Sequence, residues 1–547
     1  MSRRTLLFLG ASVSQLAAIK HARALGYRVV AVDGDPDAIA FRHADVAEVI
    51  DFTDVERVIE IGARRRVDGV LAISTDRAVG PAAAVAEALG LPGIGVDVAR
   101  GFTNKSEMRR RLASAGIPQP RSRVVTSAAD VAVAFAGFTP PVVLKPADSG
   151  GQRGLFLVDT VDDVELHLAE TLAHSRSGQA MLEEHVIGIE LNCLLVVRNG
   201  EATVLTLSDR LRPGGLGFGV GWIHVFPSVL PAATLEEAEA LAVSAVSALS
   251  LYNGIAFPQL IATADGVRVI EAGARIAAGQ MADLVSYGTG VNLFEIAFAQ
   301  AVGDDVPDRL VTRRFTRPLA IRFLTASPGI LPVGTITSIG GLDRVRSAPG
   351  VLAADLYIGP GATVRPVQVD ADRSGYVIAT AGDALEALEL ADRASELLVV
   401  QVEGEAPPAS RWRRRSVAIA VLAGAVLAAS AIAVISTMGS PLRPSLVGTS
   451  RVSKELSPAC HCPRDVARIA FRLLRAEPVT FRIVNASGHT VATLVHSRLL
   501  APGEEQFAWR GRNARGAVLP YGDYRPEVVF DTLHRTLVLP GSIDLGG

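Results

Sequence analysis

The chain has few lysines, few cysteines and little net charge, and each scarcity narrows what it can do. Only four of its 54 basic residues are lysines, so a lysine beside a distinctive motif is a candidate functional ammonium group. Three cysteines in 547 residues exclude a disulfide-based scaffold. A formal net charge of -2 provides no broad basic surface, so nucleic acid is not an expected partner.

One long hydrophobic run interrupts a chain that is otherwise typical of soluble domains. Residues 417–438 are 22 residues without a charge, and a helix of that length spans about 33 Å, enough for a bilayer core. Four arginines precede the run and one follows it: Arg411, Arg413, Arg414, Arg415 and Arg443. This asymmetry predicts a transmembrane helix at 417–438, with residues 1–416 cytoplasmic and 439–547 outside. A buried alanine-rich core helix is the alternative.

Short apolar runs alternate with helical stretches over residues 1–100, which predicts a parallel βαβ sheet. The start, SRRTLLFLGAS, has too short an apolar run for a secretory signal and is interpreted as a cytoplasmic first strand. Residues 10–14 after that strand, with Asp33 ending the second, faintly resemble a dinucleotide fingerprint. Because two of its three glycines are missing, a plain βα turn is favoured.

The most informative segment is residues 142–154, VVLKPADSGGQRG, in which an apolar run ends in Lys145 and a glycine-rich loop follows. Glycines let backbone N–H groups approach oxygen atoms closely, and a lysine adds a compact positive charge. The pattern therefore indicates a phosphate-binding loop that can close over its ligand. A surface loop after an edge strand is the alternative.

The rest of the chain falls into further segments. Lys105 opens a helix that ends at Gly116, and helices are expected near 161–174 and 235–250. Residues 254–273 predict a hairpin that turns near Asp265. Residues 317–403 have the pattern of a separate α+β unit, whereas the tail from about 456 predicts a small all-β sandwich.

Four motifs in order resemble the ATP-grasp ligases over roughly residues 1–400: NKSEMRRRLASAGIPQP, the Lys145 loop, EEHVIGIE and a late E-x-x-x-R. The fold class that follows is α/β and α+β. The expected domains are a βαβ domain at 1–100, an ATP-grasp domain at 101–305, a ligase carboxy-terminal α+β unit at 317–403, the transmembrane helix at 417–438 and an extracytoplasmic immunoglobulin-like domain at 456–547.

The resemblance implies how the nucleotide is bound. Lys105 and Lys145 would contact its phosphates, and the lid loop would comprise Ser149, Gly150, Gly151, Gln152 and Gly154. Glu183 would lie by the adenine amino group, Glu184 and Val186 would contribute main-chain contacts, and Glu190 would accept from the ribose hydroxyls. Solvated lysines and exposed strand carboxylates are the alternatives for these positions.

The metal site implied by the resemblance is incomplete. Gln259 and Glu271 would bind Mg²⁺, or Mn²⁺ in its place, because paired strands can bring both side chains onto one face. Where the family often reads E-x-N-x-R, this chain has Glu271, Gly273 and Arg275, so one ligand is absent and a second metal is in doubt. Arg275 would steady an acyl phosphate. A structural Glu271–Arg275 ion pair is the alternative.

Two features resemble the amino-acid ligase branch of the family. An H-x-x-P segment contains His224, which would donate to a developing oxyanion near the acyl group, unless it is a structural histidine. The 317–403 unit is similar to the carboxy-terminal module of these ligases. Arg210 is a weaker candidate on the substrate side.

The tail resembles the immunoglobulin-like modules of flagellar hook-capping and bacterial surface proteins. Matching positions of the pattern W-x-G-x-x-x-x-G-x-x-x-P-x-G-x-Y are Trp509, Gly511, Gly516, Pro520, Gly522 and Tyr524. These are fold residues. Cys460 and Cys462 could form a disulfide, within or between chains, or bind a metal, and the sequence does not decide.

The expected function is a membrane-anchored ATP-grasp ligase that forms an amide from a small carboxylate and an amine through an acyl phosphate. Its expected partners are ATP, Mg²⁺ and these substrates, with a homodimer implied by similar ligases and no identified partner for the outer domain. The alternative is an ATP-binding membrane sensor or scaffold without ligase turnover; a third option is an envelope-structural protein with an inactive cytoplasmic domain.

Overall fold

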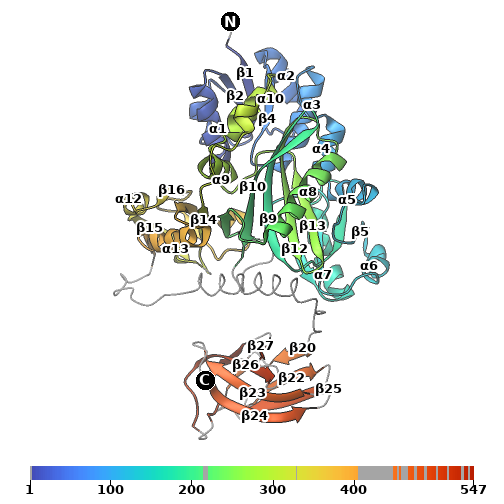
Figure 1. Cartoon of the computed structure of the whole chain (residues 1–547), viewed down its shortest axis with the longest axis vertical. Coiled ribbons are helices and arrows are strands. Elements are labelled where there is room, and N and C mark those ends of the chain that lie inside the picture. The colour runs from blue at the N-terminus through green and yellow to red at the C-terminus, as the bar shows by residue number, and fades with distance from the viewer. Residues whose placement is uncertain are drawn as a thin grey trace. The chain divides into compact units, whose positions relative to one another are not determined.

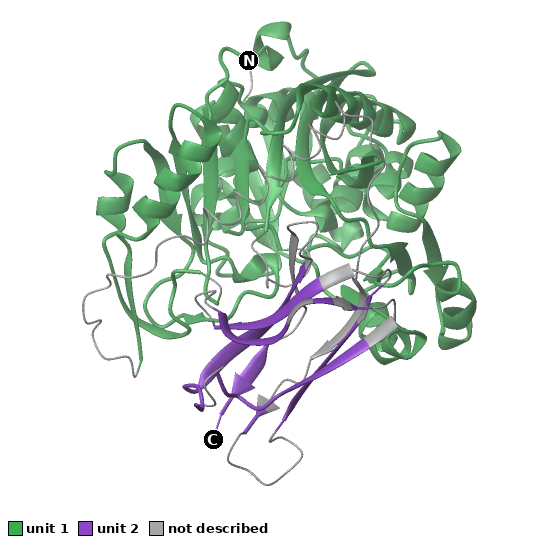
Figure 2. Cartoon of the chain, turned by 60° about the horizontal axis from the view of Figure 1, so that its bottom comes forward, with its two compact units in different colours: residues 1–437 green, residues 438–547 purple. Residues whose placement is uncertain are grey.

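The computed structural model describes residues 3–403 apart from 213–219 and 328, and residues 447–546 apart from 453–454, 458–465, 474–476, 486–489, 501–502, 514–516, 531–534 and 540–541. The chain divides into two compact units, residues 1–437 and 438–547 (Figures 1 and 2). The predicted transmembrane segment 417–438 lies outside the described residues, as do Cys460 and Cys462. Within the described ranges, no helix has the length and apolar character needed to span a membrane.

The amino-terminal sheet of unit 1 is parallel, as the βαβ pattern predicts, with strand order β3-β2-β1-β4. Its strands are β1 (Thr5–Leu9), β2 (Arg28–Asp33), β3 (Val46–Val49) and β4 (Gly69–Ala72). The helices that accompany them are α1 (Val13–Ala24), α2 (Val55–Arg65), α3 (Val79–Ala88) and α4 (Val96–Thr103), with 3-10 turns η1 (Phe41–His43) and η2 (Asp76–Ala78). Every side chain of β1 is buried, because helices cover both faces of the amino-terminal sheet.

A small antiparallel sheet follows, with order β5-β8-β6-β7. It comprises β5 (Ser122–Val125), β6 (Val142–Pro146), β7 (Phe156–Val158) and β8 (Ala180–Glu184), packed on α6 (Ala128–Phe135) and α7 (Val161–Ala173). The helix α5 (Lys105–Ser114) precedes this sheet. Its cap Asn104 accepts a hydrogen bond from the Glu107 N–H, and it ends before Gly116, whose φ is +68°.

The central sheet has eight antiparallel strands in the order β13-β12-β9-β10-β11-β14-β18-β16. Five of its strands precede residue 300: β9 (Ile189–Arg198), β10 (Glu201–Leu211), β11 (Ile223–Phe226), β12 (Gly254–Thr263) and β13 (Gly266–Gly273). The other three follow it: β14 (Leu319–Leu324), β16 (Val351–Leu356) and β18 (Gly375–Thr380). The sequence predicts a separate unit at 317–403. Instead, three strands of this segment extend the central sheet, because β14 pairs with β11.

The predicted hairpin is β12–β13, in which Gly266 takes φ +113° at the turn. Helix α8 (Ala232–Ala248) buries its alanine face against this part of the sheet. The remaining helices are α9 (Met281–Thr289), α10 (Leu293–Ala301), α11 (Asp308–Val311), α12 (Leu342–Arg346) and α13 (Ala384–Ser395), with the turn η3 (Asp370–Asp372). A three-stranded sheet contains β15 (Gly334–Gly340), β17 (Thr363–Val364) and β19 (Val399–Val402).

Unit 2 contains the two β-sheets predicted for the tail (Figure 2). One has the order β20-β22-β25, with β20 (Val447–Val452), β22 (Ala467–Leu473) and β25 (Gly503–Trp509). The other has β21 (Glu455–Leu456), β28 (Ile543–Leu545), β26 (Gly522–Phe530), β23 (Glu477–Asn485) and β24 (Thr490–Leu500), and β27 (Arg535–Val538) pairs with β26. Trp509 and Tyr524 stack edge to face in the core, and the Tyr524 hydroxyl donates to the Pro520 carbonyl at 2.7 Å.

Gly69 holds the amino-terminal sheet against α10, because a Cβ there would lie 2.5 Å from the Ala301 carbonyl oxygen. We expect Gly69→Ala to lower the free energy of unfolding by about 2 kcal/mol through overpacking. Gly80 in α3 is the matched control, since a Cβ there meets nothing within 4 Å. Gly80→Ala should instead be neutral or stabilise by up to ~1 kcal/mol. Denaturant midpoints compare the two variants, and equal midpoints would contradict the packing argument.

Candidate active site

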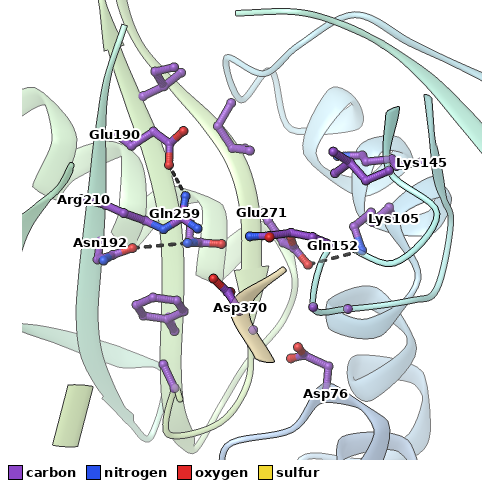
Figure 3. A pocket seen from close by; sticks show the side chains of 18 of the residues that line it. Asp76, Lys105, Lys145, Gln152, Glu190, Asn192, Arg210, Gln259, Glu271 and Asp370 are labelled. Atoms are coloured by element: carbon purple, nitrogen blue, oxygen red, sulfur yellow. Dashed lines mark hydrogen bonds and ion pairs between the residues drawn. The ribbon is translucent and has the colours of Figure 1, made fainter. Parts of the chain in front are cut away.

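The residues predicted to be functional converge on one pocket between the β5-β8-β6-β7 sheet and the eight-stranded sheet (Figure 3). All of them except Gly154 line it: Lys105, Lys145, Ser149, Gly150, Gly151, Gln152, Glu183, Glu184, Val186, Glu190, His224, Gln259, Glu271 and Arg275. Their assigned roles remain predictions. Arg210, the weaker candidate, also lines the pocket.

Lys105 stands at the first residue of α5, directly after the cap Asn104. Its ammonium donates to the Ser149 carbonyl at 2.7 Å and lies 3.3 Å from Oε1 of Glu271. The side chain is 10% exposed, so it reaches from the helix start to both the glycine loop and the hairpin strand β13. A cation in this place can contact an anion that enters between loop and strand.

Lys145 belongs to a buried cluster of three charges. Its ammonium lies 2.8 Å from Oε2 of Glu183, and Arg109 binds both oxygens of the same carboxylate at 3.0 Å. Burial alone would raise the pKa of Glu183, but Arg109 and Lys145 outweigh burial and lower it to about 2. Glu183 is therefore ionised, and its carboxylate binds two cations of the protein. The cluster carries one net positive charge toward the pocket.

Arg109 does not line the pocket but supports it through Glu183, and the sequence analysis missed it. It is 4% exposed, and it also donates to the Ile270 carbonyl at 2.5 Å, next to Glu271. The guanidinium thus joins β8 of the small sheet to β13 of the central sheet. A signal was present, because Arg109 follows Lys105 by four residues and must lie on the same helix face.

Most residues of the glycine loop line the pocket, whereas one of its glycines packs against a helix. Ser149, Gly150, Gly151 and Gln152 line the pocket, and Gly151 and Gln152 have φ of +71° and +64°. Gly154 does not line it. A Cβ at Gly154 would meet side-chain and backbone atoms of α7 and the following residue within 3.2 Å, so this glycine permits close packing.

The strand proposed to face adenine is held by ion pairs. Glu184 lies 3.4 Å from Arg268 and 3.6 Å from Arg121, and Val186 follows it on the pocket wall. Glu190, at the start of β9, binds Arg210 and Arg212 through its two carboxylate oxygens. If Glu190 accepts a hydrogen bond from a ribose hydroxyl, as predicted, its carboxylate must bind Arg210 and Arg212 at the same time.

Gln259 and Glu271 lie directly opposite each other on β12 and β13, as predicted for metal ligands on paired strands. The Gln259 amide nitrogen donates to Asn192 at 3.2 Å, so its carbonyl oxygen remains for another partner, and Glu271 is 33% exposed. Across the described part of the chain, no group of three or more His, Cys, Asp or Glu could hold a metal. Two oxygen donors fit one Mg²⁺ whose other ligands are phosphate and water.

His224 lies on β11 and is 4% exposed. Its Nδ1 is 3.0 Å from the amide nitrogen of Asn192, and Phe323 meets its ring edge to face with centroids 5.5 Å apart. Burial, then Arg210 and Arg373, lower the pKa of His224 well below its ordinary value, so the imidazole is neutral. A neutral histidine can donate through one ring nitrogen only.

Arg275 forms an ion pair with Asp76, and the alternative pairing with Glu271 is not found. Nε and Nη2 of Arg275 bind the two Asp76 oxygens at 2.8 and 2.7 Å. Burial would raise the pKa of Asp76, but Arg275 outweighs it and keeps that pKa below its ordinary value. Asp76 stands in η2, just after β4, and was missed. Its position beyond the carboxyl end of a parallel strand was an available signal.

The segment after residue 317 also reaches the pocket, through Asp370 and Arg373 near η3 (Figure 3 labels Asp370). Asp370 accepts from the Gly221 N–H at 3.3 Å, and Arg373 donates to the Gly221 carbonyl at 3.2 Å. Arg373 lies over the Phe323 ring, 4.3 Å from its centroid. These residues close the end of the pocket next to His224.

Family models match four consecutive parts of the chain. They are the ATP-grasp N-terminal domain over residues 19–93, the carbamoyl-phosphate synthase L chain ATP binding domain over 104–309, the L-amino acid ligase C-terminal domain 2 over 322–403 and the FlgD Ig-like domain over 465–532. The first three cover most of the amino-terminal sheet, all of the β5-β8-β6-β7 sheet, most of the central sheet and the segment with Asp370.

Relatives match the same region of the chain. The chain is 30% identical over 387 residues to the phosphoribosylamine–glycine ligase of Streptomyces coelicolor, covering 66% of this chain and 90% of that enzyme. The chain belongs to the ATP-grasp ligases. This ATP-grasp ligase is also 26% identical over 389 residues to the uncharacterized protein y4rH of Sinorhizobium fredii, covering 69% of this chain and 78% of that protein.

A solved structure shows the same fold. The L-amino acid ligase from Bacillus licheniformis matches with a TM-score of 0.64 and 20% identity, covering 74% of this chain and 100% of that one. The ATP-grasp ligase described here is thus an ATP-dependent enzyme that forms carbon–nitrogen bonds. Enzymes of this family use ATP with Mg²⁺ or Mn²⁺.

The role of Arg109 can be tested through nucleotide binding. We expect Arg109→Lys to weaken ATP binding on the order of tenfold, because lysine keeps the charge but cannot bind both Glu183 oxygens and the Ile270 carbonyl together. Calorimetric titration with Mg-ATP measures the dissociation constant. Arg110→Lys is the matched control, since Arg110 is 65% exposed and pairs only at the surface with Glu107. Equal losses in both variants would refute the assignment.

Proposed function

We propose that this chain is a membrane-anchored carboxylate–amine ligase that forms an amide through an acyl phosphate. The observation that carries the proposal is that Lys105, Lys145, Gln259, Glu271 and Arg275 line one pocket, with the Lys105 ammonium next to Glu271 and Gln259 opposite Glu271 on the paired strand. Phosphoryl transfer requires charge neutralisation and positioning, and these five groups supply both. The amino-acid ligase match over 322–403 supports amino acids as substrates.

The first step transfers the terminal phosphoryl group of ATP. A substrate carboxylate oxygen attacks the γ-phosphorus, the bond to the β,γ-bridging oxygen breaks, and ADP leaves. Lys105 and Lys145 hold the phosphates, and the glycine loop excludes water. Gln259 and Glu271 would hold a magnesium ion, which would neutralise charge on the phosphate oxygens when bound. Arg275 binds the acyl phosphate that results.

The second step forms the amide. The amine nitrogen attacks the acyl carbon, the carbon–oxygen bond to phosphate breaks, phosphate leaves, and the amine loses a proton to solvent. Negative charge develops on the carbonyl oxygen during the attack. The buried, neutral His224 donates a hydrogen bond to that oxygen.

The decisive experiment measures phosphate release from Mg-ATP across a panel of amino acids and other small carboxylates, with hydroxylamine as a trap for the acyl phosphate. We expect carboxylate-dependent release and hydroxamate formation. Glu271→Ala should reduce both by 10²-fold or more, on the order seen when a group that stabilises transition-state charge is lost. Glu201→Ala is the matched control, because Glu201 is exposed at the first residue of β10.

Two results would redirect the assignment. ATP binding without carboxylate-dependent release would support the alternative of a membrane sensor or scaffold. Absence of ATP binding would instead indicate a structural protein with an inactive cytoplasmic domain. The two oxygen donors at Gln259 and Glu271 favour catalysis over both.

The membrane location is part of the same proposal. The uncharged run at 417–438 and the arginines before it support one span, with the ligase region cytoplasmic and the immunoglobulin-like domain outside. A reporter fused after Gly547 should then be accessible from outside intact cells. A reporter fused before residue 411 is the control and should be protected. Protection of both reporters would exclude this topology.

A further inference from the structure

Asn192 lies between the predicted metal ligand and the predicted oxyanion donor, yet neither role includes it. It stands on β9, is 0% exposed and is the β-sheet partner of Gln259 on β12. Its amide is hydrogen-bonded on both sides: the oxygen to Gln259 and the nitrogen to His224 (Figure 3 shows the contact with Gln259). A fully buried amide satisfied in this way has one preferred orientation.

The chemistry of the groups fixes the direction of each hydrogen bond. The Gln259 amide nitrogen can only donate, so Asn192 Oδ1 accepts at 3.2 Å. Asn192 Nδ2 can only donate as well, so Nδ1 of His224 accepts at 3.0 Å and carries no hydrogen. The hydrogen of the neutral ring is therefore on Nε2. That nitrogen lies on the side of Gly279, where a Cβ would be 3.6 Å away.

We propose that Asn192 is a positioning residue that fixes His224 as an Nε2–H donor and turns the Gln259 carbonyl oxygen toward Glu271. The inference rests on the proposed function, because the donor has a purpose only if an oxyanion forms there. The Asn192 amide would thus orient two groups: Gln259, the metal ligand for phosphoryl transfer, and His224, the hydrogen-bond donor for amide formation.

The surroundings of His224 explain why the tautomer must be held. Two guanidinium groups face it, Arg210 from β10 and Arg373 from the segment after η3, and both disfavour an imidazolium ion. Their carboxylate partners are Glu190 for Arg210 and Asp370 for Arg373. Phe323 covers an edge of the ring. Since the ring stays neutral, its ability to donate depends on which nitrogen carries the hydrogen.

Asn192→Asp is the sharpest test, because a carboxylate in this place still accepts from Gln259 but must accept from Nδ1–H of His224. At high pH the ring would then present a bare Nε2 to the pocket, whereas at low pH the imidazolium would donate again. The new carboxylate raises the pKa of His224 from its depressed native position, so amide formation should fall on the order of tenfold to a hundredfold as rising pH removes the proton of the imidazolium. The native enzyme should show no such fall.

Two further variants isolate the tautomer. His224→Gln keeps a hydrogen-bond donor that does not titrate, so the double variant with Asn192→Asp should lose the pH dependence. Asn192→Ser removes the bridge without adding charge, and it should lower amide formation at all pH values. An unchanged pH profile in Asn192→Asp with normal turnover would overturn the proposal.

The tautomer of His224 can be measured without any turnover, so this measurement tests the inference separately from the proposed function. Long-range ¹H–¹⁵N spectra of histidine-labelled full chain distinguish the two tautomers, and comparison with His224→Gln assigns the signal. We expect the Nε2–H form at pH 7 in the native protein and the Nδ1–H form or imidazolium in Asn192→Asp. A native Nδ1–H form or imidazolium would refute the role of Asn192, even if hydroxamate forms. Correct tautomers without any hydroxamate would refute the ligase assignment alone.

Discussion

The buried carboxylate of Glu183 is the interaction on which the pocket depends. It binds Lys145 on the neighbouring strand β6 and Arg109 on α5, and Arg109 in turn binds the carbonyl beside Glu271. Lys145, predicted to contact phosphate, and β13, which carries the predicted metal ligand Glu271, therefore share one anchor. Removing the carboxylate would leave two cations without a counter-ion in the interior, a change that costs about 3–5 kcal/mol when buried pairs are broken.

The pocket closes because distant parts of the chain meet across the central sheet. The amino-terminal sheet contributes Asp76 through η2, and the segment after residue 317 contributes Asp370 through η3. The latter is possible because β14 adds directly to β11, so the carboxy-terminal segment is a continuation of the sheet and carries its turn to the pocket edge. The lining of the pocket at that edge therefore comes from a region outside the nucleotide motifs.

Local patterns predicted the parts of the site that depend on local geometry. The hairpin register places Gln259 opposite Glu271, and the capped helix start places Lys105, because strand pairing and capping are determined by nearby residues. The sequence analysis missed Arg109 and Asp76, whose partners are 74 and 199 residues away. Which long-range ion pair forms depends on how the sheets pack, and local sequence patterns do not reveal that packing. Gly154 was assigned to the ligand because packing glycines and ligand-facing glycines look alike in sequence.

The missing asparagine at position 273 and the Asp76–Arg275 pair are two aspects of one arrangement. A Cβ on Gly273 would lie 3.3 Å from Oδ1 of Asp76, so a larger side chain there would displace the carboxylate that binds Arg275. The glycine thus removes one metal donor and leaves room for an anion from the amino-terminal sheet. In the proposed mechanism, Arg275 divides its hydrogen bonds between Asp76 and an acyl phosphate. Because both are anions, Asp76 and the acyl phosphate of the proposed mechanism compete for the same guanidinium group.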